Sequence, residues 1–323
     1  MATADLQADG PPSTSGRGRP GRRRPNGRAR PARGRSTFAN TVQNGAFLAP
    51  SVLVVGVLLL VPFALTTYQS FTQDNGLEPA TFVGLDNYIA LMRDAGFLHS
   101  LLNTVLWTIG AILLPAGVGL AIATFTQHLR FGKIFQLVFI VPYALSGVAT
   151  GTIWSFLLST EGPINTVLAG VGLGALAQGW LLTWPVNTLV MIGVYVWQVS
   201  GVAVILFLVG LNAVPKETIE AGQLDGAKGP TLFWQIIFPQ LRAITVVVIG
   251  ISLTNGLRVF DLIWVLTGGG PGQVSEALAV TMYRRTFVLG QYGVGSAVAV
   301  MLTIIVVVTS WIYLRAQMPR RIR

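Results

Sequence analysis

The chain has 323 residues, of which 52% are hydrophobic and 11% charged, and its mean hydropathy is +0.63. Because soluble domains carry about 25% charged residues, this composition excludes a soluble globular protein and predicts a polytopic membrane protein. The net charge of +10 does not indicate nucleic-acid binding, since nine arginines cluster between Arg17 and Arg35 without interleaved aromatic residues. Cysteine is absent, which excludes disulfides, thiolate metal sites and catalytic thiols.

Residues 1–44 form the first predicted segment, a basic tail rich in arginine, glycine, proline and serine. Because the tail has almost no apolar side chains to bury, we expect it to be disordered. Two roles remain open for its arginines. They could attract anionic lipid, at about 1 kcal/mol for each basic residue near the surface, or act only as a solvated determinant of topology.

Six apolar runs follow, each close to the roughly 20 residues that a helix needs to cross a bilayer. They cover residues 46–68, 101–126, 134–158, 186–211, 244–266 and 294–314. The predicted fold class is therefore all-α, a membrane bundle of six transmembrane helices within residues 45–316. A short basic segment, 317–323, ends the chain. Pro115 and Pro142 predict kinks in the second and third spans.

The basic residues in the connections predict how the spans are oriented. With the N-terminus in the cytoplasm, eighteen of the 22 lysines and arginines fall on the inner side and one, Arg258, inside a span. Only Arg93, Arg284 and Arg285 fall on the outer side. This distribution fits the positive-inside rule, and it predicts that both termini are cytoplasmic.

The connection between the fourth and fifth spans, residues 215–240, is polar and amphipathic. Its apolar residues come in short helical groups, interrupted by Gly226 and by Gly229 and Pro230, which permit sharp turns. We expect two short helices at the membrane surface, on the cytoplasmic side. A soluble partner could engage these helices and move the spans attached to them.

This connection resembles the cytoplasmic EAA loop of bacterial ABC importer permeases, because Glu220, Ala221, Gly226, Ile236 and Pro239 fall at the spacing of that motif. Gly222 stands where alanine is usual, which lowers helix propensity by about 1 kcal/mol, and Phe238 replaces the usual leucine. The resemblance implies a set of residues that couple the chain to an ATPase: Glu220, Ala221, Gly222, Asp225, Gly226, Ile236 and Pro239.

Polar residues recur at intervals of three in the fifth predicted span, which predicts that they share one face of the helix. They are Ser252, Asn255, Arg258 and Asp261. Ionisable groups inside a membrane are costly and by default mark a transport pathway. The alternative is that Arg258 and Asp261 form an ion pair that locks the helix to a neighbour.

The fourth span adds Tyr195 and Gln198 to this pathway. Aromatic planes cover the apolar faces of sugars and amides bond their hydroxyls, so these residues and Asn255 predict a sugar-binding face. The alternative is that the aromatic residues only anchor the span at the membrane interface.

A second motif follows at the end of the fifth span. Its matching residues are Phe260, Asp261, Leu266, Thr267, Gly269, Gly270 and Pro271, and they resemble the maltose and glycerol-phosphate branch of sugar-type permeases. Glycine backbones can approach a partner closely. The resemblance implies that Gly269, Gly270 and Pro271 lie in an outer loop near an extracytoplasmic binding protein.

The sequence carries no phosphate-binding loop, because Ala227 precedes Lys228 where the motif needs a glycine. We therefore expect a transport subunit that is not an enzyme and holds no cofactor of its own. The resemblance implies a bacterial cell membrane protein with three kinds of partner: a second homologous permease, two ABC ATPase subunits that bind ATP and magnesium, and a solute-binding protein. A di- or oligosaccharide is the expected substrate.

Other functions remain open. An ion-coupled secondary transporter would need no ATPase, but it predicts internal repeats and paired broken helices. A scaffold protein would leave the polar face of the fifth span unexplained. Glycerol phosphate is an alternative substrate, because Arg258 could bind a phosphate.

Overall fold

The computed structural model describes residues 49–127 and 129–317. The basic tail predicted for residues 1–44 and residues 318–323 of the C-terminal segment lie outside this description. The chain consists of two units, Met1–Gly56 and Val57–Arg323, and every contact given below lies within the second unit.

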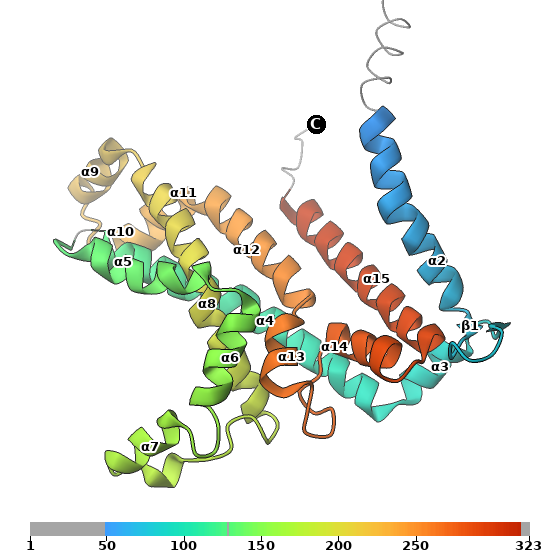
Figure 1. The fold of residues 1–323 in the computed structure, drawn as a ribbon. Helices are drawn as coiled ribbons and strands as arrows, with labels where there is room; N and C mark the ends of the chain where they lie inside the picture. The colour runs from blue at the N-terminus through green and yellow to red at the C-terminus, as the bar shows by residue number, and fades with distance from the viewer. Residues whose placement is uncertain (1–48, 128, 318–323) are drawn as a thin grey trace, which may run out of the picture. The chain divides into compact units, whose positions relative to one another are not determined.

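The described chain is built almost entirely of helices (Figure 1). The α-helices are α2 (Val61–Gln69), α3 (Asp86–Arg93), α4 (Ala95–Thr126), α5 (Gly132–Ile140), α6 (Gly147–Leu157), α7 (Pro163–Gly170), α8 (Val186–Asn212), α9 (Lys216–Leu224), α10 (Pro230–Leu232), α11 (Phe238–Gln240), α12 (Arg242–Leu257), α13 (Asp261–Thr267), α14 (Leu278–Tyr283) and α15 (Tyr292–Gln317). The short 3-10 helices are η2 (Val141–Ala144) and η3 (Gly174–Leu176), and the short π-helices are η1 (Gly56–Leu60), η4 (Phe233–Ile237) and η5 (Arg284–Val288). A small antiparallel hairpin pairs β1 (Thr72–Gln73) with β2 (Thr81–Phe82).

Within the described residues, four helices are long and apolar enough to cross a membrane, namely Ala49–Gln69, Ala95–Thr126, Val186–Asn212 and Tyr292–Gln317. Two bent helix pairs in the same part of the chain pass this test together, so residues 49–127 and 129–317 hold up to six spans if each pair crosses once. This confirms the predicted class, an all-helical membrane bundle. Two of the six predicted helices nevertheless differ from straight spans.

The third span is broken. Helix α5 and turn η2 meet α6 at an angle of 106°. Pro142 lies in η2, and Ser146 caps α6 by accepting a hydrogen bond from the Ala149 amide at 3.1 Å. The break exposes the Leu145 carbonyl, which accepts a hydrogen bond of 2.9 Å from the Gln198 side chain of α8. A side chain of a neighbouring span therefore satisfies the freed backbone group, as a membrane interior requires.

The fifth predicted span, residues 244–266, is not one continuous helix. Helix α12 ends at Leu257 and α13 begins at Asp261, while α12 is preceded, across a bend of 72°, by the helical segment Pro230–Gln240. The side chain of Arg258 donates to the Thr254 carbonyl at 3.3 Å, so it caps the end of α12. Because the helix stops there, the polar residues do not form one continuous helical face.

Small residues bring the central helices close together. A Cβ placed on Gly119 of α4 would lie 2.5 Å from Ala203 Cβ of α8. A Cβ placed on Gly256 of α12 would lie 2.8 Å from Ala111 Cβ of α4. Helix α4 is therefore packed directly against both α8 and α12, the two helices that supply residues to the candidate site described below.

Helices α6 and α13 form a second close pair (Figure 1). Gly147 and Gly151 are four residues apart on α6 and both face α13, where a Cβ on Gly151 would lie 2.8 Å from Val265 Cβ. This spacing is the small-residue pattern of tightly packed membrane helices. Both helices begin directly after a break in a span, so the two breaks lie at the same end of the pair.

Candidate functional site: a polar cavity and a coupling element

A cavity of about 430 Å³ lies where the two broken spans meet α8. Its lining residues come from the loop around η2, from α8, and from the break between α12 and α13: Tyr143, Leu145, Gly147, Tyr195, Gln198, Val199, Asn255, Arg258, Val259, Phe260, Asp261 and Leu262. This volume falls within the range of about 300–1,000 Å³ that is typical of small-molecule sites.

Five of the six predicted pathway residues line this one cavity, namely Tyr195, Gln198, Asn255, Arg258 and Asp261. The sixth, Ser252, is buried and lines a smaller adjoining space of about 40 Å³ together with Tyr195 and Asn255. The tertiary fold therefore brings together residues that lie up to 66 positions apart in the chain, although whether they contact a transported solute stays a prediction.

The two charged residues of the cavity are not paired with each other. Within residues 49–127 and 129–317, Arg258 and Asp261 form no ion pair. Asp261 instead lies beside Gly147 at the start of α6, because a Cβ placed on Gly147 would be 3.5 Å from its Oδ2 atom. Asp261 is also the first residue of α13, so its carboxylate lies at the N-terminus of its own helix and beside the start of α6, positions that favour a negative charge. Arg258 is the cation that lines the cavity.

Tyr143 was not predicted as a pathway residue, yet it lines both the cavity and the smaller adjoining space and is 53% exposed. It follows Pro142 directly, and a proline within an apolar run was the available signal for a break that turns nearby side chains toward a cavity. Gln198 lines the cavity as well, and its amide nitrogen donates a hydrogen bond to the Leu145 carbonyl.

The coupling element, residues 215–240, forms the two short helical segments that were predicted. Helix α9 ends before Gly226, whose φ of 89° needs a glycine, and Gly229, with φ of 51°, starts the second segment. The two segments pack through Gly222, which is buried, and Ile236, whose Cδ1 atom lies 2.1 Å from where a Cβ on Gly222 would stand. Two residues of the EAA motif are thus in direct contact.

The remaining motif residues of α9 lie on its surface. Glu220, Ala221 and Asp225 are exposed, as is Pro239 on the second segment. Leu224, at the end of α9, is 89% exposed, and the motif match did not single it out. Ile219 packs into the core with α8 and α12, so one side of α9 is held against the bundle and the opposite side is exposed.

The loop after α13 is held by polar contacts. Arg284 forms an ion pair with the buried Glu276 and donates to the Gly268 carbonyl. Gly269 has φ of 85° and is buried beside these two side chains, whereas Pro271 is exposed. Of the predicted loop residues, Pro271 therefore presents a surface that a partner can reach, while Gly269 supports the loop from within.

Asn103 of α4 is a polar residue that the sequence analysis did not single out, although it makes four hydrogen bonds to other elements. It is fully buried, and its amide nitrogen donates to the Val274 and Glu276 carbonyls, each at 2.9 Å. Its oxygen accepts from the Trp184 indole at 3.0 Å and from the Thr188 hydroxyl at 3.3 Å. One side chain thus joins α4, α8 and the loop after α13.

Comparison with known proteins agrees with this arrangement. The profile of the family described as "Binding-protein-dependent transport system inner membrane component" matches residues 114–322. A probable ABC transporter permease protein of Pyrococcus horikoshii is 34% identical over 275 residues, which cover 83% of this chain and 93% of the relative. The probable starch degradation products transport system permease protein AmyD of Thermoanaerobacterium thermosulfurigenes is 29% identical over 286 residues, covering 88% and 97%.

A solved structure has the same fold. It is a bacterial ABC transporter involved in the import of the acidic polysaccharide alginate, and one of its chains aligns with a TM-score of 0.73 at 19% identity, covering 88% of this chain and 99% of that chain. The family resemblance inferred from residues 220–239 and 260–271 is confirmed. The chain belongs to the family of binding-protein-dependent transport system inner membrane components, and it is a multi-pass permease subunit of the ABC transporter type.

Proposed function

We propose that the chain and a second, homologous permease form the translocation path for a di- or oligosaccharide that an extracytoplasmic binding protein delivers. The observation that carries this proposal is the cavity at the two helix breaks, which gathers five polar or aromatic residues named from the sequence. Two ABC ATPase subunits, which bind ATP and magnesium, supply the energy, and this chain needs no cofactor of its own.

The chemistry of the cavity supports a sugar. Tyr143 and Tyr195 offer aromatic surfaces for apolar sugar faces, and Asn255 offers an amide for hydroxyl groups. The name of AmyD, a relative that covers nearly the same length, points in the same direction. Glycerol phosphate is the second candidate, because Arg258, which forms no ion pair with any described residue, lines the same cavity, and guanidinium groups bind phosphate.

The contacts of α9 support a coupling mechanism. ATP-driven closure of the ATPase subunits would move the exposed side of α9, which carries Glu220 and Leu224. Ile219 and Ile237 pack into the core with α8 and α12, so this motion is transmitted to the helices that form the cavity walls. The cavity would then change from inward-facing to outward-facing.

The test replaces Glu220 by alanine, with Glu217→Ala as the matched control, because Glu217 is an exposed acid on the same helix outside the motif. We expect Glu220→Ala to reduce ATP-dependent uptake in vesicles at least tenfold while the ATPase subunits still copurify. Glu217→Ala should transport normally. Normal uptake by Glu220→Ala would overturn the coupling assignment.

A second measurement separates the rival functions. Uptake into vesicles should require ATP and should persist when the proton gradient is abolished. Uptake that follows an ion gradient without ATP would identify a secondary transporter instead. Screening sugars and glycerol phosphate for stabilisation of the binding protein, followed by uptake of each, would assign the substrate.

A further inference from the structure

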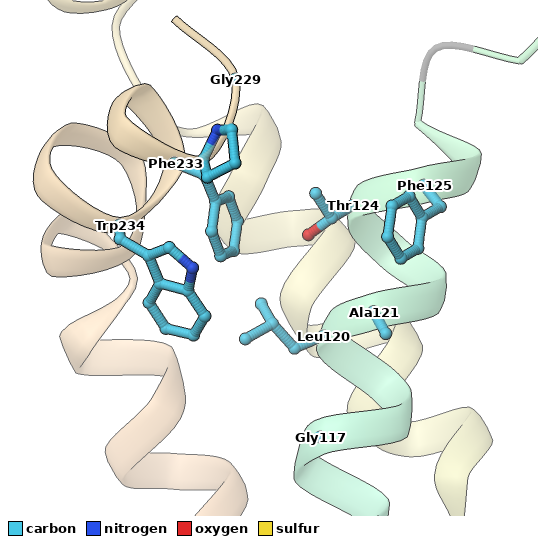
Figure 2. Close-up of a pocket in the computed structure, with 9 residues that line it drawn as sticks. Gly117, Leu120, Ala121, Thr124, Phe125, Gly229, Phe233 and Trp234 are labelled. Carbon is cyan, nitrogen blue, oxygen red and sulfur yellow. The ribbon is translucent and has the colours of Figure 1, made fainter. Parts of the chain in front are cut away.

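A groove of about 560 Å³ lies apart from the polar cavity, between the last turns of α4 and the start of the second coupling segment (Figure 2). Its lining residues are Gly117, Leu120, Ala121, Thr124, Phe125, Gly229, Pro230, Phe233 and Trp234. The lining is almost wholly apolar, and Phe125 and Trp234 are 76% and 58% exposed. An apolar groove of this size can bury the apolar surface of an acyl chain.

Two hydrogen-bond donors interrupt the apolar lining. Figure 2 shows the Thr124 hydroxyl and the Trp234 indole nitrogen turned toward the space between the helices. In the part of the chain that the structure describes, the Thr124 hydroxyl is buried and has no hydrogen-bond partner. A purely apolar occupant would leave this hydroxyl unsatisfied, whereas an amphipathic occupant with acceptor oxygens would bond it.

Basic residues stand at the same end of α4. Lys228 directly precedes Gly229 of the groove, and Arg130 and Lys133 follow the end of α4. All three are exposed, and among residues 49–127 and 129–317 none forms an ion pair, including with Asp225, three positions before Lys228. Basic pockets between membrane helices on the cytoplasmic side recognise anionic lipid headgroups.

We propose that this groove binds an anionic phospholipid of the inner leaflet. One acyl chain lies against Leu120, Ala121 and Phe233, and the ester region receives the Thr124 and Trp234 donors. The phosphate lies near Lys228. Because the groove joins α4 to the coupling segment, a bound lipid braces the two elements against each other. The site is separate from the path assigned to the transported solute.

The experiment uses the full chain assembled with its partner subunits in nanodiscs. Phosphatidylglycerol and phosphatidylcholine, each with a photoreactive diazirine on an acyl chain, are cross-linked in parallel, and labelled peptides are identified by mass spectrometry. We expect phosphatidylglycerol to label peptides 117–125 and 229–234 more strongly than phosphatidylcholine. Lys228→Gln should reduce this preference about fivefold, the effect of one surface charge.

Ala121→Phe, which fills the groove, should remove labelling of both groove peptides. The internal control is α15, whose exposed Ile304 and Val307 face outward from the bundle and should be labelled equally by both lipids in all variants. Equal labelling of the groove by the two lipids would show ordinary bilayer contact and overturn the proposal. Labelling of α15 but not of the groove would overturn it as well, because it would show that a partner subunit covers the groove.

Discussion

Gly222 occupies the position where the EAA motif usually carries its second alanine. The sequence alone suggests a small loss of helix stability there, about 1 kcal/mol. The structure adds a packing reason, because Ile236 occupies the space that an alanine Cβ would need. Because Ile236 keeps the residue that is usual at its motif position, the end of its side chain must move to make room for the usual alanine at position 222.

This contact leads to a prediction for Gly222→Ala. Alanine favours the helix by about 1 kcal/mol, and the atom that its Cβ would meet, Ile236 Cδ1, is the free end of a flexible side chain that can move aside at small cost. We therefore expect the thermal unfolding temperature of the purified complex to stay equal or to rise slightly in the single variant. A clearly lower unfolding temperature that Ile236→Val restores would show that the Ile236 side chain cannot move.

The separation of Arg258 from Asp261 leads to a second prediction. Asp261→Asn should lower the stability by about 0.3–1 kcal/mol, because it removes a negative charge from the N-terminus of α13 and from beside the start of α6. Arg258→Gln should reduce uptake while leaving the unfolding temperature nearly unchanged. The double variant should be additive within about 0.5 kcal/mol. A coupling above about 1 kcal/mol would show that the two residues act as an ion pair.

At the scale of elements, the packing of α6 on α13 positions the cavity-lining residues at the start of both helices, Gly147 and Asp261. Gly151→Val would place a Cβ 2.8 Å from Val265, so we expect a loss of about 1–3 kcal/mol and reduced uptake. The matched control is Gly193→Ala in α8, where no atom lies within 4 Å of the added Cβ. This control should be neutral or stabilise by up to about 1 kcal/mol. Equal unfolding temperatures for Gly151→Val and the parent would contradict the close packing.

The broken spans show how far proline in the sequence predicts where a helix breaks. Pro142 predicted a kink, and the third span bends beside it. Pro115 carried the same signal, yet it is buried within the continuous helix α4. The difference is tertiary, because at the first break Gln198 of α8 is placed to bond the freed Leu145 carbonyl. The end of α12 at Leu257 had no proline signal at all.

At the scale of the molecule, we propose that the chain crosses the membrane with both termini in the cytoplasm. The absence of cysteine makes this testable, because one introduced cysteine is the only thiol of this chain. Glu78 and Lys216 are exposed residues outside the motifs. We expect a membrane-impermeant thiol reagent to label Glu78→Cys in intact cells, and Lys216→Cys only after the membrane is opened. The opposite pattern would reverse the orientation.

The sequence by itself determined the membrane class, the family and the coupling element. Hydrophobic runs and fixed motif spacings are local properties, so they can be read along the chain at Glu220, Gly226 and Pro239. It also named Asn255, Arg258 and Asp261 as polar residues in an apolar setting, because such residues are costly there whatever they face.

Only the tertiary structure decided what those residues face. Asp261 lies beside the start of α6, more than a hundred positions earlier in the chain, and the fully buried Asn103 bonds carbonyls of the loop after α13 that are 171 and 173 positions away. Such partners come from packing between distant helices, where close approach at Gly147, Gly151 and Gly256 sets which groups meet. The physical reason is that spacing along one helix fixes a face, whereas the groups that satisfy a charge or a freed carbonyl depend on the neighbour that this face contacts.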